Sequence, residues 1–421
     1  ITQPSGTVLA ANLQVTATGD VTLDQATNDL GTVSADLNPG NFSLADVNDV
    51  TVGTVVSSGI QTGNPATGGD VTINATNGTI TVDSAISTST GTGGGISLGG
   101  SVDINAPLTA GGGNISLNGS GSGAVDLTID ADLSSNISMT LTAPRDIIVG
   151  AATLTTTGAG ADITLTADSE TTPDGIGGVQ IATLGRIDSA DAVTLTGSDL
   201  FITGGLDPDS VEIASDGTTT QVQASGDVLV QDGADAPAAA QTIVNGVINA
   251  SGAGATITIT AVDDVLFGAD GDVIGVSGTV TVAAGTGEIV MTNGALIDAG
   301  TGLIDMDANA NITLGALLTT TEVRVTSVNG AIVDGGDDEG GDINAATAAL
   351  RAETGIGTDA NPLETVADPG TTTLTVGATT DSGDIALSNT GALIVGTVDG
   401  LSGAMVEDSA NDNSGADNIT L

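Results

Sequence analysis

The chain alternates apolar and polar residues in short runs that recur along most of its length. Each run begins with a small residue and then Asp, Asn, Thr or Ser, and continues as an apolar–polar–apolar triplet. Clear examples are GDVTINA at 69–75, GNISLNG at 113–119, ADITLTA at 161–167, GTVTVAA at 278–284 and GDIALSN at 383–389. A period of two is typical of a strand with one buried face. The pattern therefore predicts a series of short strands separated by turns.

The spacing of these strands predicts how they stack. Successive strand cores are expected at Ile96–Leu98, at Ile115–Leu117 and at Ile137–Met139. Secondary strands are expected between them, at Val102–Ile104 and Leu127–Ile129. Two or three strands in every stretch of about 19–24 residues indicate the coils of a parallel β-helix, an all-β solenoid. At about 4.8 Å of rise per coil, roughly 20 coils would be on the order of 100 Å long.

Tandem β-sandwich domains are the alternative architecture, because their strands also recur every 8–12 residues or so. They would need domain-sized repeats of about 100 residues joined by linkers, and neither is visible in the sequence. Residues 1–60 fit the repeat less well and are predicted to be irregular N-terminal or boundary coils. Residues 61–421 are predicted to be one continuous repeat region, and longer flank loops are expected near 168–178, 232–242 and 334–342.

Turn residues are consistent with short coils. Asn-Gly pairs are expected to form turns with positive φ, and they begin at Asn77, Asn118, Asn245, Asn293 and Asn329. The chain starts with Ile1 rather than Met, and its last residues, ADNITL, resemble the start of another strand. It is therefore expected to be a segment of something longer, with end coils that offer unpaired strand edges.

Composition favours a narrow solenoid and limits the partners. Only three residues are aromatic, and a thin column filled with Val, Ile, Leu and Ala does not need the large areas that aromatic side chains bury. The 52 acidic residues face four arginines and no lysine or histidine, which gives a net charge of −48. Such a charge repels nucleic acid and anionic membranes, so neither is a predicted partner. Membrane insertion is not expected either, because no apolar run approaches the length of a membrane-spanning helix.

Most catalytic arrangements are excluded by the missing residue types. Without His or Cys there is no Ser–His or Cys–His nucleophile pair and no zinc site built on those ligands. The Gly-rich strings at 91–95 and 110–114 lack the strand–helix context of a nucleotide loop and are interpreted as turns. Paired carboxylates are the one enzymatic option, but glycoside cleavage also relies on sugar-binding groups that are scarce here. The chain is predicted not to be an enzyme.

Acidic clusters suit calcium better, because Ca²⁺ prefers carboxylate and carbonyl oxygens and Gly lets a loop wrap closely. The densest cluster, DGGDDEGGD at 334–342, matches neither the EF-hand spacing nor the nonapeptide of calcium-binding β-rolls. A solvated acidic loop is the favoured interpretation of this stretch, and a calcium loop is the alternative. No cofactor other than Ca²⁺ is expected. The candidate ligands are Asp334, Asp337, Asp338, Glu339 and Asp342, together with Asp270 and Asp272.

One segment resembles a known family. Its residues are GIG at 355–357, NPL at 361–363 and GDI at 383–385, and a similar order of phrases occurs in the repeat region of filamentous-haemagglutinin-type surface proteins. The resemblance covers 350–365 and 372–396 in detail and is compositional elsewhere. It implies a right-handed parallel β-helix in a very large secreted bacterial protein that serves as a stalk or adhesive shaft.

These observations predict a structural protein of the cell exterior or cell surface. Its expected role is a rigid acidic rod, as part of a giant adhesin or stalk or as a self-assembling filament, sheath or surface layer. The expected partners are other copies, joined end to end or laterally, and extracellular glycans or cell-surface components. A glycan- or host-binding adhesin module is the alternative function, and a carbohydrate-active β-helix enzyme is a more distant one.

Overall fold

The computed structural model is a parallel β-helix, as the repeat predicts. It describes residues 1–64, 66–91, 93–119, 127–167, 169, 177–197, 210–214, 220–232, 240–336, 341–367, 373–406 and 419–421. Within these residues there is no helix, and hence none long and apolar enough to cross a membrane. The chain forms two compact units: 1–208 with 222–224, and 209–221 with 225–421. The handedness of the coils stays a prediction.

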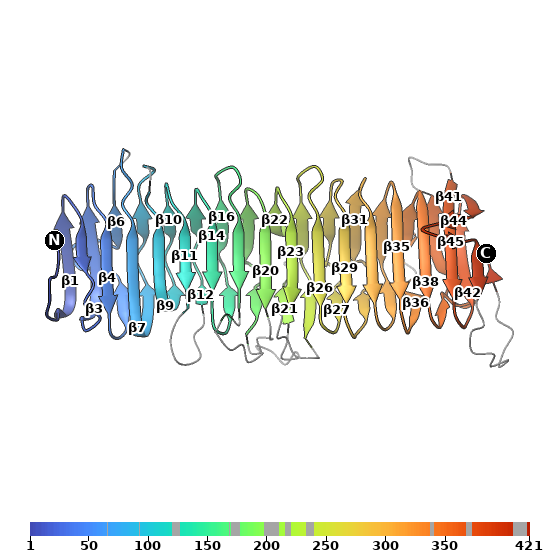
Figure 1. The fold of residues 1–421 in the computed structure, drawn as a ribbon, viewed down its shortest axis with the longest axis horizontal. Coiled ribbons are helices and arrows are strands. Elements are labelled where there is room, and N and C mark those ends of the chain that lie inside the picture. The colour runs from blue at the N-terminus through green and yellow to red at the C-terminus, as the bar shows by residue number, and fades with distance from the viewer. Residues whose placement is uncertain are drawn as a thin grey trace. The chain divides into compact units, whose positions relative to one another are not determined.

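In each unit the chain runs through three ladders in turn, and each strand pairs in parallel with its counterpart in the next coil (Figure 1). In unit 1 the first ladder contains β2 (Val21–Leu23), β4 (Phe42–Asp46), the starts of β7 (Val71–Val82) and β9 (Ile96–Ile104), β11 (Ile115–Asn118), β14 (Met139–Thr142), β17 (Ile163–Thr166) and β20 (Val193–Gly197). The second contains β1 (Leu9–Ala17), β3 (Asp29–Leu37), β5 (Val50–Val52), the ends of β7 and β9, β12 (Leu127–Ile129), β15 (Ile147–Val149) and β18 (Val179–Ile181). The third contains β6 (Ile60–Thr62), β8 (Ile86–Thr88), β10 (Leu108–Ala110), β13 (Leu133–Ser135), β16 (Thr153–Thr156), β19 (Arg186–Ser189) and β22 (Thr220–Ala224).

Unit 2 has the same three ladders. The first contains β23 (Val228–Asp232), β26 (Ile257–Ala261), β29 (Val280–Ala284), β32 (Ile304–Ala308), β35 (Glu322–Ser327), β38 (Thr347–Ala352), β41 (Thr373–Thr380), β43 (Ala392–Val395) and β46 (Ala404–Val406). The second contains β21 (Ser210–Ile213), β24 (Gln241–Val244), β27 (Val265–Phe267), β30 (Ile289–Met291), β33 (Ile312–Leu314), β36 (Ala331–Asp334), β39 (Gly355–Ile356), β42 (Ile385–Thr390) and β47 (Ile419–Thr420). The third contains β25 (Val247–Ala250), β28 (Val273–Gly275), β31 (Leu296–Gly300), β34 (Ala316–Thr319), β37 (Ile343–Ala345) and β40 (Leu363–Ala367).

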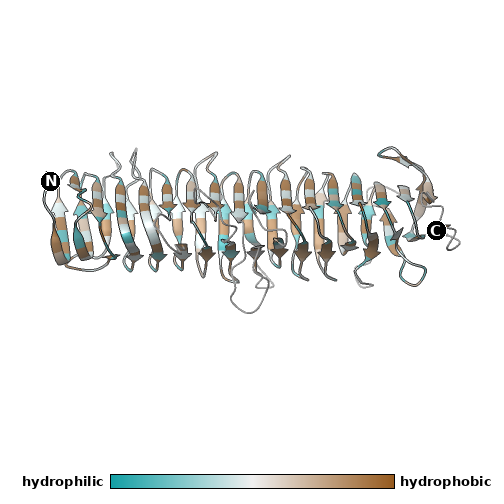
Figure 2. Cartoon of the chain, turned by 60° about the horizontal axis from the view of Figure 1, so that its bottom comes forward, coloured by the Kyte–Doolittle hydropathy of each residue, from teal (hydrophilic) through white to brown (hydrophobic). Residues whose placement is uncertain are grey.

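The apolar positions of the triplets fill the interior, and the polar positions between them face outward, as the alternating colours along the strands show (Figure 2). Equivalent residues stack from coil to coil, because the parallel register places each directly beside its counterpart. Leu98, Leu117, Leu141 and Leu165 form one such buried column in the first ladder of unit 1. The core is therefore a bundle of aliphatic columns, which explains how the chain folds with three aromatic residues.

One strand core begins later than predicted, because the turn before it is longer than expected. The strands expected at 102–104 and 127–129 are present, but the next strand begins at Met139 rather than at Ile137. Ile115 pairs with Met139, and Ile137 is 45% exposed in the preceding turn. Coil lengths also vary more than expected, because Ile96 pairs with Ile115 across a short coil whereas Ile187 pairs with Val222 across a much longer one. Insertions lengthen the turns while the strands keep their register.

The Asn-Gly pairs do not act mainly through positive φ. Of their five glycines, only Gly294 has positive φ, at 100°. The others permit close packing between coils: a Cβ on Gly78 would lie 2.2 Å from the backbone carbon of Asn48, and one on Gly330 would lie 2.6 Å from that of Ala310. These glycines are therefore explained by the neighbouring coil rather than by the turn itself.

A repeated hydrogen bond joins the coils at the corners where strands begin. The residue before a strand is often Asp, Asn or Ser, and its side-chain oxygen accepts the backbone N–H at the equivalent corner of the next coil, over 2.7–3.3 Å. We call these contacts corner bonds. They occur in all three ladders. The acceptors are Asp20, Asn41, Asp70, Asn114, Ser138, Asp162 and Asp227 in the first ladder, Asp49, Asp146, Asp264 and Asn311 in the second, and Asp132, Asp272 and Asp342 in the third.

The corner bond of Asp70 is expected to be measurable by mutation. Its Oδ1 accepts the N–H groups of Gly94 and Gly95, each at 2.9 Å. In Asp70→Ala both donors lose their protein acceptor, which should lower the free energy of unfolding by about 1–2 kcal/mol. Hydrogen exchange measured by mass spectrometry should speed up in the peptide that contains these amides. Asp70→Asn keeps an acceptor oxygen and should behave almost like the parent, and equal exchange in both variants would contradict the role.

Candidate metal centre

Three carboxylates converge at a corner of unit 2, between its second and third ladders. Asp334 is the last residue of β36, and Asp342 immediately precedes β37. Glu364 is the second residue of β40, which pairs in parallel with β37 in the register Ile343 to Thr365. Carboxylate oxygens from the three side chains lie within 4.8 Å of one another. The site therefore joins the end of β36 and the start of β37 to the neighbouring coil.

The cluster is largely removed from solvent. Asp342 is 1% exposed and Asp334 is 8% exposed. Two of the oxygens accept backbone hydrogen bonds: Asp342 Oδ2 from the Glu364 N–H and Asp334 Oδ1 from the Gly336 N–H, each at 2.7 Å. Asp334 Oδ2 is buried and accepts no hydrogen bond from any described residue. A buried carboxylate oxygen without a donor is costly, so this position calls for a proton or a cation.

The electrostatics of the site lead to the same conclusion. Burial is the main cause that raises the pKa of Asp342 from 3.8 to about 9, and the nearby charges of Asp334 and Glu364 raise it further. The Glu364 N–H opposes this shift by stabilising the carboxylate. The arginines of this unit, Arg324 and Arg351, pair with Glu322 and Asp399 rather than with the cluster. Like charges held this close together in a dry corner favour either a retained proton or a bound cation.

The structure places the candidate ligands predicted from the sequence in different environments. Asp334 and Asp342 meet in this cluster, whereas Asp337, Asp338 and Glu339 lie outside the described residues. Asp272 makes a corner bond to the Leu296 N–H at 3.2 Å, and its pKa is raised mainly by burial, with Asp270 adding to the shift. Asp270 is exposed, and its carbonyl accepts the Asp272 N–H. Among the described residues, only Asp334, Asp342 and Glu364 form a group of three suited to a metal.

Glu364 is the residue that sequence reasoning missed. It lies one coil after Asp342, far beyond the acidic stretch, and reaches the site through strand pairing. The available signal was weak: the chain has few glutamates, and this one falls within the NPLET segment that starts a strand. To predict that Glu364 reaches the site, one must know how many residues the intervening coil contains, and this number varies along the repeat.

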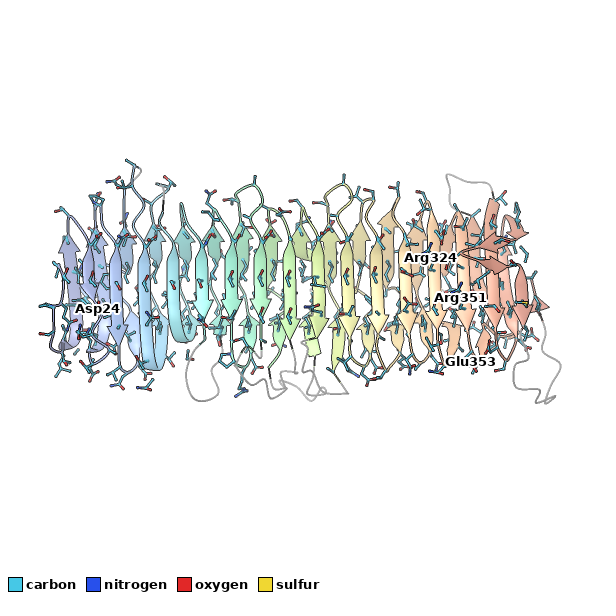
Figure 3. The ribbon with its side chains drawn as sticks, in the orientation of Figure 1. Asp24, Arg324, Arg351 and Glu353 are labelled. Carbon is cyan, nitrogen blue, oxygen red and sulfur yellow. The ribbon has the colours of Figure 1, made fainter. Side chains whose placement is uncertain are left out.

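A second charged site lies on the outer face of the first ladder of unit 2. Arg324 on β35 and Arg351 on β38 lie on neighbouring strands (Figure 3). Both pair with Asp399, whose Oδ1 is 3.5 Å from Arg324 Nη2 and whose Oδ2 is 3.7 Å from Arg351 Nη2. Arg324 also pairs with Glu322 at 2.5 Å. A hollow of about 170 Å³ lies among these groups, and its lining also includes Asp305 and Asp307.

Asp399 belongs to an antiparallel hairpin, β44 (Thr397–Val398) and β45 (Leu401–Ser402), which departs from the parallel stacking. Its two turn residues both have positive φ, 46° at Asp399 and 78° at Gly400, as a type I′ turn requires. The Arg351 guanidinium also donates to the Asp399 carbonyl at 2.9 Å. The hairpin is thus fastened to the sheet face by the arginine pair.

Releasing this hairpin is expected to have a local effect. Asp399→Asn preserves the tolerance for positive φ but removes the charge that both arginines contact. Because the pairs are partly exposed, the cost should be about 0.2–1 kcal/mol, seen as cleavage by a protease near 397–402 rather than as global unfolding. Asp381→Asn, on the same unit, is the comparison, and equal cleavage of both variants would show that the ion pairs do not hold the hairpin.

Comparisons with family models, curated protein sequences and solved structures give no match. The fold and the geometry described above are therefore what characterise the chain: a β-solenoid with an acidic cluster at one corner.

Proposed function

We propose that this chain is a structural segment of a secreted or cell-surface bacterial protein, in which a stiff acidic β-helix provides length and surface display. The observation that carries the proposal is the uninterrupted coil-to-coil pairing within each unit, reinforced by corner bonds at all three corners. Each coil contacts only its neighbours, so such a fold adds length without needing a larger core.

The resemblance to filamentous-haemagglutinin-type repeats supports a stalk or shaft. Two of its matching phrases lie on neighbouring strands of this chain, because Gly355–Ile356 forms β39 and Ile385 starts β42, which pairs with it. Adhesion itself would need a binding tip, so the proposal for this segment is mechanical support.

The acidic exterior suggests how copies interact. A net charge of −48 keeps neighbouring copies apart at low ionic strength, and divalent cations would reduce that repulsion. We therefore propose calcium-dependent lateral or end-to-end association into a filament, sheath or surface layer. Nucleic acid and anionic membranes are poor partners for the same electrostatic reason.

Catalysis is not part of the proposal. The chain has no His, Cys or Lys, and its densest described carboxylate cluster is buried, with Asp342 1% exposed, so a polysaccharide could not reach it. A glycosidase needs two carboxyl groups on either side of an accessible bond.

Electron microscopy of the purified chain, in EDTA and then in millimolar Ca²⁺, tests the proposal. Thin single particles that join end to end or side by side with Ca²⁺, and separate again with a chelator, are expected. Magnesium at the same concentration is the control for simple charge screening. Globular or beaded particles would contradict the assignment as a structural rod. Thin particles that stay single in every buffer would contradict the proposed assembly.

A further inference from the structure

We infer that Asp334, Asp342 and Glu364 form a Ca²⁺ site inside unit 2, which fastens one coil to the next. Two observations carry this inference. The first is the convergence of three carboxylates within 4.8 Å at a single corner. The second is the buried Oδ2 of Asp334, a residue only 8% exposed, which has no hydrogen-bond donor among the described residues. The site is independent of the surface role proposed above.

The spacing of the oxygens fits calcium coordination. Calcium binds oxygens at about 2.3–2.6 Å, so any two of its ligands lie no more than about 4.6–5.2 Å apart. The three carboxylate oxygens lie within 4.8 Å of one another, so small side-chain adjustments would bring all three onto one ion while the strands stay in place. Backbone carbonyls or water would complete the six to eight oxygens that this ion usually takes.

Burial favours Ca²⁺ over Mg²⁺ at this site. Magnesium gives up its water reluctantly and demands near-ideal octahedral geometry, so it usually keeps several waters. At this corner Asp342 is 1% exposed and its Oδ2 accepts the Glu364 N–H, so an ion bound here would have to give up most of its water. Calcium accepts irregular carboxylate cages and is the better match.

The position of the site predicts its consequence. Asp334 ends β36, Asp342 precedes β37, and Glu364 comes from the next coil of the third ladder. An ion bound to all three would hold the end of β36, the start of β37 and β40 together. Without the ion the corner must either keep a proton or hold carboxylates that repel one another, so calcium should convert a locally destabilising corner into a stabilising one.

The substitution Asp334→Asn tests this inference, because its effect on the melting temperature should differ in sign between EDTA and Ca²⁺. The variant keeps the Oδ1 acceptor for the Gly336 N–H and replaces the unpartnered oxygen with a donor. In EDTA the variant should therefore melt at the same temperature as the parent or at a higher one. In millimolar Ca²⁺ the parent should melt at the higher temperature, so that the order of the two proteins reverses.

Calorimetric titration of the EDTA-treated full chain with CaCl₂ measures the binding directly. In NaCl of about 0.15 M, which screens weak surface binding, the parent should show one site tighter than the rest. Asp334→Asn and Glu364→Gln should each weaken that site about tenfold or more. Asp132→Asn, which changes a corner-bond aspartate of unit 1, is the matched control and should leave the tight site unchanged.

The possible outcomes distinguish a calcium site from a purely structural group of carboxylates. A reversal in melting order together with loss of the tight site in both variants supports the calcium site. A destabilisation by Asp334→Asn that is equal in EDTA and Ca²⁺ would show a purely structural carboxylate and overturn it. Equal isotherms for the parent, Asp334→Asn and Glu364→Gln would also overturn it, and so would an equally tight site for Mg²⁺.

Discussion

Replacing Phe267 with alanine is expected to lower the free energy of unfolding by about 3–5 kcal/mol, the range for large truncations in a packed core. Phe267 is 1% exposed and ends β27, where it stacks between Val244 of the preceding coil and Met291 of the following coil. A narrow column cannot collapse around the resulting cavity, because the strand spacing on either side is set by backbone hydrogen bonds.

Urea unfolding followed by circular dichroism would measure this effect. Phe267→Leu fills most of the same volume and is the control, with an expected cost below about 1.5 kcal/mol. A midpoint for Phe267→Ala that matches the parent would mean that the coils around β27 do not contribute to the cooperative unit that the denaturant unfolds.

Stability is expected to rise when the pH is lowered from 7.5 towards about 5, which is unusual for a folded protein. Burial is the main cause that raises the pKa of Asp46, and it also raises the pKa values of Asp272 and Asp305. The folded state then holds these protons more tightly than the unfolded state does. Stability is therefore greatest at acid pH and falls as the pH rises from the ordinary carboxyl pKa of 3.8 through the raised values.

Melting temperatures across this pH range would test the sign, with the net charge of −48 acting in the same direction. Added NaCl at pH 7.5 should recover part of the difference, because it screens the repulsion between exposed charges. Asp46→Asn removes one of the titrating groups and should flatten the pH dependence, whatever it does to stability at a single pH. A melting temperature that rises steadily from pH 5 to 7.5 would contradict the prediction.

The fold was predictable because its signal is local and repeated. In the triplets at 71–73, 96–98 and 115–117, the alternation of apolar and polar residues indicates which side chains face inward. That information, repeated along the chain, is almost enough to predict a parallel solenoid. What failed was the register where a turn is long: Ile137 has the same apolar character and phase as Met139, and only the neighbouring strand decides between them. The hairpin was missed although Asp399-Gly400 between alternating residues is a strong hairpin signal.

The candidate metal site was predictable only in part, for a related reason. Asp334 and Asp342 belong to one acidic stretch and were visible as a pair. Glu364 joins them through the pairing of β37 with β40, and because coil length varies along the chain, the repeat leaves that partner undetermined. Asp272 illustrates a different limit of sequence reasoning. By residue type its carboxylate could bind a cation, but in the structure it accepts the Leu296 N–H of the next coil.

The corner bonds named above run in one direction, although the reverse contact also occurs where Asn28 Oδ1 accepts the Val8 N–H of the preceding coil. In each named corner bond an earlier coil supplies the acceptor and a later coil supplies the N–H, as in Asp20 to Asn41, Asn41 to Asp70, and Asp70 to Gly95. A coil that has just formed therefore presents side-chain acceptors to the chain that follows it, in addition to the backbone groups that pair in the ladders, as when the Val71 N–H donates to the Gly95 carbonyl. Such a fold can be laid down in order from the N-terminal side, each coil templating the next as the chain is synthesised.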